Sequence, residues 1–82
     1  MPIEIPDSLR PIINALPKEI RDEMDRVLNL IMTDPKNKEL DIEEITIWGI
    51  GYHATEIDGY RVLFRYSPDS GIIQLHGVGE IQ

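Results

Sequence analysis

The stretch that decides the fold is residues 59–80, GYRVLFRYSPDSGIIQLHGVGE. Its first half alternates apolar and polar side chains from Tyr60 to Ser67, and a period of two is typical of a strand buried on one face. The block Pro68-Asp69-Ser70-Gly71 then has the residue types of a turn, because Pro presets φ and Gly accepts positive φ. The stretch therefore predicts a β-hairpin whose return strand covers residues 72–78.

The register of this hairpin depends on the length of its loop. A loop of three residues would mix Arg with Ile and Leu on one face, whereas a loop over residues 68–71 leaves one face wholly apolar, so we expect the longer loop. The cross-strand neighbours are then Ser67–Ile72, Tyr66–Ile73, Arg65–Gln74, Phe64–Leu75, Leu63–His76, Val62–Gly77 and Arg61–Val78.

The polar face of the hairpin carries Arg61, Arg65, Gln74 and His76. Such a set has the chemistry to bind phosphate or carboxylate groups, and we take these four residues as the candidate binding site. Metal-free cleavage of RNA needs an acid, a base and cationic stabilisation of the transition state, so Arg61 and His76 are the candidate catalytic residues. The alternative is an ordinary solvated sheet face, which is the rule where only the other face is covered.

Length and composition limit the possible functions. The 82 residues suggest one domain over 1–82 with a modest core, and the absence of Cys excludes disulfides and cysteine nucleophiles. The net charge of -7 repels phosphates, so free nucleic acid is not an expected partner. No secretory leader, membrane-spanning segment or cofactor motif is evident, so we expect a cytoplasmic protein without a cofactor and without a membrane partner.

The remainder of the chain predicts helices followed by strands. Residues 1–5 suit a short strand, and a short helix with Leu9, Ile12, Ile13 and Leu16 on one face follows. A longer helix begins near Pro17 and stops at Asp34-Pro35. After a polar connector, residues 44–57 form one bent or bulged strand or two short ones, and Asp58-Gly59 is a hairpin turn. The expected class is α+β: an N-terminal helical hairpin packed on a small antiparallel sheet of three to four strands.

Two further features have structural interpretations. Gly49-Ile50-Gly51 lacks the third Gly of a dinucleotide fingerprint and is interpreted as a glycine bulge within a strand, with Trp48 as a core or rim aromatic. His53 and Glu56 are three residues apart, so on a strand they point to opposite faces, and no metal site is expected.

The order of elements and two motifs resemble the RelE/ParE superfamily of bacterial toxins from type II toxin-antitoxin pairs. The motifs are Asp34-Pro35 after the second helix and Asp58-Gly59-Tyr60-Arg61-Val62-Leu63-Phe64-Arg65-Tyr66, which is similar to the family's G-D-Y-R-V-I-Y-R-I strand. Residues 72–79, which end His-Gly-Val-Gly, resemble the family's last strand. Arg61 is the best single match.

The resemblance implies a toxin-family fold with a concave sheet face, an antitoxin-type protein partner, and action on either the ribosome or DNA gyrase. This chain is acidic and reads Glu80-Ile81-Gln82 where the family often has His-Arg and an aromatic residue that serve RNA cleavage. We therefore expect a toxin-family protein that binds a macromolecule through the C-terminal hairpin face without full nuclease chemistry. Two alternatives stay open: a non-toxic protein-interaction module that keeps the fold, and a metal-free, ribosome-dependent mRNA endoribonuclease. We also expect Glu80 to neutralise Arg61 with a salt bridge.

Overall fold

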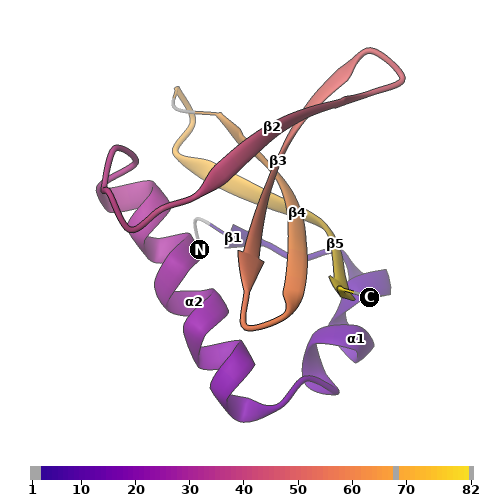
Figure 1. Ribbon diagram of the computed structural model, residues 1–82. Helices are drawn as coiled ribbons and strands as arrows, with labels where there is room; N and C mark the ends of the chain where they lie inside the picture. Colours follow the sequence, from indigo (N-terminus) through magenta and orange to yellow (C-terminus); the bar gives the residue numbers. More distant parts are fainter. Residues whose placement is uncertain (1–2, 68, 82) are drawn as a thin grey trace.

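A computed structural model of the chain describes residues 3–67 and 69–81. Its helices lie in the sequence between β1 and the other four strands of the sheet, as shown in Figure 1. The elements in chain order are β1 (Ile3–Glu4), the 3-10 turn η1 (Asp7–Leu9), α1 (Arg10–Asn14), α2 (Lys18–Thr33), β2 (Ile42–Ile47), β3 (Ile50–Ile57), β4 (Tyr60–Ser67) and β5 (Ile72–Glu80). The predicted α+β class is confirmed.

The helices form where local sequence favours them. Pro11 lies in the first turn of α1, where its missing N–H has no intrahelical acceptor to lose, and Pro17 immediately precedes α2. The apolar stripe of α2 is buried at Ile20, Met24, Leu28 and Ile31. The helix ends at Thr33, before Asp34-Pro35, because a residue that precedes Pro is pushed out of the helical region.

The five strands form one mixed sheet in the order β1-β5-β4-β3-β2. β1 runs parallel to β5, whereas the other neighbours are antiparallel. The prediction of a wholly antiparallel sheet of three to four strands was therefore wrong, because it did not foresee that the N-terminal residues would add to the edge at β5. Met1 and Pro2, which belong to the strand predicted over residues 1–5, lie outside the described residues.

The hydrophobic core lies between the helices and one face of the sheet. Phe64 and Val62 of β4 are 1% exposed, and Ile73 of β5 is 0% exposed. They pack in one cluster with Leu28 and Ile31 of α2. The apolar face predicted for the C-terminal hairpin is therefore confirmed as the face that meets the helices. We call the opposite face of the sheet the outer face.

The predicted register of β4 and β5 holds for only half of their length. Ser67 faces Ile72 and Phe64 faces Leu75, as the four-residue loop requires, although the loop residue Pro68 lies outside the described residues. A bulge then shifts the pairing at His76, so that Leu63 faces Gly77. The expected pairs Leu63–His76, Val62–Gly77 and Arg61–Val78 were wrong, and Val62–Val78 and Arg61–Gly79 take their place. The extra residue keeps Leu75 and Val78 both on the core side.

Residues 42–57 fold into two strands and a tight turn. Trp48 and Gly49 have φ of 52° and 78°, the geometry of a two-residue hairpin turn, so Gly49 is not in a bulge within a strand. Trp48 is 97% exposed, which makes its interpretation as a core or rim aromatic wrong. The next turn is at Asp58-Gly59, as predicted, with φ of 46° and 85°. Within the described residues, no helix is long and apolar enough to cross a membrane.

Candidate binding surface on the outer face of the sheet

The outer face is built by the alternate residues of each strand that point away from the core. Because Val62 and Phe64 of β4 face the helices, Arg61 and Arg65 lie on the outer face, and both are exposed. Gln74 of β5 lies directly opposite Arg65, so the predicted pair of polar neighbours is confirmed. Its other neighbour is Glu4 of β1, so the outer face continues onto that edge strand.

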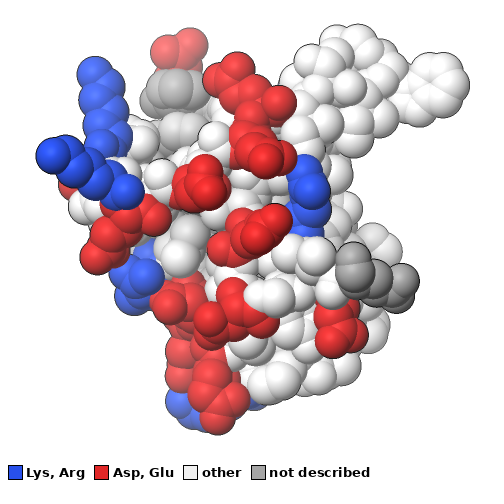
Figure 2. Space-filling model, viewed as in Figure 1, with Lys and Arg blue, Asp and Glu red and all other residues white. Residues whose placement is uncertain are grey.

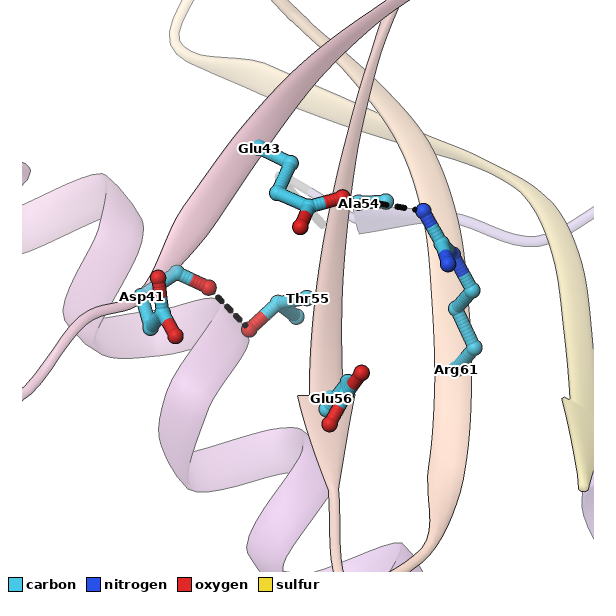
Figure 3. Close-up of a pocket in the computed structure, with 6 residues that line it drawn as sticks. All are labelled: Asp41, Glu43, Ala54, Thr55, Glu56 and Arg61. Atoms are coloured by element: carbon cyan, nitrogen blue, oxygen red, sulfur yellow. Dashed lines mark hydrogen bonds and ion pairs between the residues drawn. The ribbon is translucent and has the colours of Figure 1, made fainter. Parts of the chain in front are cut away.

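Arg61 is held by a carboxylate that the sequence did not single out. Its Nη2 donates a hydrogen bond of 3.0 Å to Oε2 of Glu43 on β2, across the intervening β3. Figure 3 shows this pair crossing β3 at Ala54, with Glu56, the register partner of Arg61, two residues further along that strand. The two side chains keep 47% and 68% of their surface exposed. The expectation that Glu80 neutralises Arg61 was therefore wrong, since Glu80 faces Tyr60 in the register.

The pocket around Arg61 is too small for a nucleotide. It has a volume of about 70 Å³ and is lined by Asp41, Glu43, Ala54, Thr55, Glu56 and Arg61. The Thr55 hydroxyl donates a hydrogen bond of 3.1 Å to the backbone carbonyl of Asp41, which closes one wall of the pocket (Figure 3). Ligand sites for drug-sized molecules measure roughly 300–1,000 Å³. Three carboxylates around one guanidinium also disfavour any phosphate here.

Arg65 has a different environment. Among residues 3–67 and 69–81 its guanidinium makes no hydrogen bond or ion pair. It borders an open pocket of about 340 Å³ that Gln74, Ser67 and Ser70 also line. The Ser70 hydroxyl already donates a hydrogen bond to the backbone carbonyl of Ser67. The guanidinium, the Gln74 carboxamide and the Ser67 hydroxyl can still bind a phosphate or carboxylate through several donors. Glu4 also lines this pocket, and its negative charge weakens the binding of an anionic ligand there.

His76 is exposed, and its ring packs edge-to-face on Tyr52 of β3, with centroids 5.1 Å apart and planes at 77°. This contact lies on the outer face, because Tyr52 is two residues from Ala54, which pairs with the outward Leu63. The bulge places His76 level with Leu63 and Phe64, so Leu63 lies between it and Arg61 on the outer face. The candidate catalytic residues Arg61 and His76 are thus not brought together, and their catalytic role stays a prediction.

Tyr52 is a candidate binding residue that sequence analysis missed. Alternation within residues 50–57 would have placed it on one face with Ala54 and Glu56. The signal was lost because Glu44 to Ile57 was interpreted without a partner strand, so no cross-sheet neighbours were assigned. The described outer face therefore has two polar sites: Arg61 with its carboxylates, and Arg65, Gln74, His76 and Tyr52, which we call the open polar site. Within the described residues, no group of three or more Asp, Glu or His side chains could hold a metal ion.

Comparison with known proteins supports the fold and little beyond it. No protein-family model and no curated protein sequence matches the chain. Among solved structures, a chain of the archaeal RelE–RelB complex from Pyrococcus horikoshii OT3 matches with a TM-score of 0.76 and 14% identity, over 95% of this chain and 91% of that one.

Two structures from E. coli are also similar. The isolated RelE toxin matches with a TM-score of 0.62 and 13% identity, over 98% of this chain and 83% of that chain. A chain of the intact RelBE toxin-antitoxin complex matches with a TM-score of 0.60 and 14% identity, over 98% of this chain and 95% of that chain. The chain therefore has the fold of these RelE structures, at a sequence identity of only 13–14%.

Proposed function

We propose that the chain is a RelE-like toxin-family protein of a type II toxin-antitoxin pair that acts by binding a macromolecule through the outer face of β4 and β5. The observation that carries the proposal is the open polar site, in which Arg65, Gln74, His76 and Tyr52 lie together, with the Arg65 guanidinium free of partners among the described residues. The protein acts in the cytoplasm and without a cofactor. Its target is the ribosome or DNA gyrase.

An antitoxin-type protein is the proposed regulatory partner. Support comes from the fold, which this chain shares with chains of RelE–RelB and RelBE complexes over nearly its whole length. In this proposal Arg65 meets the target and the bound antitoxin keeps the protein inactive. Full nuclease chemistry is not part of the proposal, because Arg61 is paired with Glu43 and separated from His76 by Leu63.

The test is induced expression of the chain in a bacterium, with growth and messenger RNA integrity followed together. We expect growth arrest with intact transcripts. Arg65→Ala removes charge-assisted hydrogen bonds worth roughly 1.5–3 kcal/mol, so it should weaken target binding about ten- to a hundredfold and relieve the arrest. Arg21→Ala is the matched control, since Arg21 is exposed on α2 and lies away from the outer face.

The other two functions predict different outcomes. Growth arrest with cut transcripts, abolished by Arg61→Ala or His76→Ala, would replace the proposal by the metal-free endoribonuclease. Normal growth at a high level of the expressed protein would replace the proposal by the non-toxic protein-interaction module. One observation favours the non-toxic interaction module. Arg61, the best single match to the toxin motif, is already engaged in an ion pair with Glu43.

A further inference from the structure

The end of the β2–β3 hairpin carries three of the five large apolar side chains that are exposed within the described residues. We call residues 45–52 the arm. Figure 1 shows it extending beyond the rest of the sheet, and Figure 2 shows it as a projection without Lys, Arg, Asp or Glu. Trp48 at its tip is 97% exposed, and Ile47 and Ile50 beside it are 39% and 43% exposed. Contiguous apolar surface of this kind marks interaction sites in proteins that are otherwise well packed.

Neither packing nor turn geometry explains Trp48. With φ of 52° it adopts a left-handed conformation that costs a residue with a Cβ roughly 1–2 kcal/mol, and Asn or Asp suit this turn better. Its indole gains nothing from burial in the free protein. Trp is also the residue type most often found as an energetic anchor at interfaces. An exposed Trp in a turn that suits other residues therefore has the features of an interface anchor.

The arm continues into an unpaired sheet edge. β2 is the last strand in the order β1-β5-β4-β3-β2, so one side of its backbone has N–H and C=O groups that no other strand of residues 3–67 and 69–81 pairs with. Such an edge accepts an added strand from a partner, with specificity set by alternate side chains. Next to the arm, this edge strand carries Glu43 and Glu44, with Asp41 just before it.

Charge decides between possible occupants. Figure 2 shows acidic side chains gathered beside the arm, over β2 and β3. Antiparallel pairing of two copies along β2 would bring Glu43 and Glu44 of each copy close to those of the other, which is destabilising. Nucleic acid is repelled for the same reason, in a chain of net charge -7. A basic segment is attracted, and its charge also favours rapid, specific association.

We propose that the arm and the free edge of β2 bind an extended segment of a protein partner. Apolar side chains of the segment pack against Trp48, Ile47 and Ile50, and consecutive Lys or Arg side chains lie beside Asp41 and Glu44, which are on opposite faces of the sheet. The inference rests on the proposed function in one respect, which is that the segment belongs to the antitoxin-type partner. It adds the location and the chemistry of that contact. Tyr52 is the one residue that the arm shares with the open polar site, whose Arg65, Gln74 and His76 lie on β4 and β5.

Trp48 supplies the readout, because it is the only Trp in the chain. The probe is a synthetic peptide of about nine residues with Lys in one half and Val in the other, long enough to pair with a strand. Added to the purified protein, it should shift the fluorescence emission of Trp48 to shorter wavelength in a saturable way. The same peptide with Glu in place of Lys should leave the emission unchanged.

Two double variants test the charge contribution. Asp41→Asn with Glu44→Gln removes two charges beside the arm, leaves the Arg61–Glu43 pair in place, and should weaken binding of the Lys peptide by about tenfold, or about 1.4 kcal/mol. Glu19→Gln with Asp25→Asn removes two charges from exposed positions of α2 and should change the affinity by less than about twofold. Circular dichroism checks that each variant is folded.

Three results would overturn the inference. Equal binding of the Glu and Lys peptides would mean that charge plays no part, and binding without a shift of Trp48 emission would place the segment elsewhere. A shift that depends on protein concentration alone would make a second copy the occupant. The titration uses no target and no growth assay, so its failure leaves the toxin proposal standing, and absence of growth arrest leaves the peptide result standing.

Discussion

The β4–β5 hairpin and the β2–β3 arm use similar strand residues and differ in what covers them. Val62, Phe64 and Ile73 of the first are at most 1% exposed, since α2 packs on that face. Ile47 and Ile50 of the arm are 39% and 43% exposed, because the register places them on the outer face and the arm extends beyond the rest of the sheet (Figure 1). Apolar strand residues therefore form core where a helix lies over them, and form a candidate interface where none does.

The largest expected difference between the two hairpins is in stability. Phe64→Ala should lower the free energy of unfolding by about 3–5 kcal/mol, because it empties a fully buried site. Trp48→Ala should change it by less than about 0.5 kcal/mol, since the indole is exposed. Urea unfolding followed by circular dichroism measures both. If the loss for Trp48→Ala approached that for Phe64→Ala, the arm would be packed in solution and the contrast would fail.

A smaller effect is expected where the two hairpins are joined. The Arg61–Glu43 pair links β4 to β2, and its side chains are largely solvated. A double-mutant cycle with Arg61→Ala and Glu43→Ala should give a coupling energy of about 0.2–1 kcal/mol that decreases as salt is added. Arg65→Ala combined with Glu43→Ala serves as the control pair, because no contact joins those side chains. A salt-independent coupling above about 2 kcal/mol would indicate a buried pair and contradict the exposed geometry.

Local patterns were enough to predict the class of fold. The alternation around Phe64, the turn ending at Gly71, the Asp58-Gly59 turn and the Pro residues around α1 and α2 each specify structure through near neighbours. The likeness of residues 58–66 and 72–79 to RelE/ParE motifs also indicated this fold. Arg65 and Gln74 were also placed correctly, because they lie on the loop side of the bulge.

The missed features depend on residues that are distant in the sequence. Glu43 reaches Arg61 from a position 18 residues away, and that contact exists only because β2, β3 and β4 are adjacent. The bulge at His76 keeps Leu75 and Val78 both on the core side of β5, and no residue type near it predicts a bulge at this position. Trp48 was assigned to the core or its rim because large aromatic residues usually pack there. Its exposure follows from the position of the helices.

The contrast between the hairpins is tested most directly by native-state hydrogen exchange of the free protein, resolved by residue. The account predicts the slowest exchange at the amides of Phe64, Ile73 and Leu75, close to the rate set by global unfolding. It predicts exchange through local opening, at least about a hundredfold faster, at Ile47, Ile50 and Gly51 of the arm. Equal protection of both hairpins would contradict the claim that coverage by the helices separates core from interface.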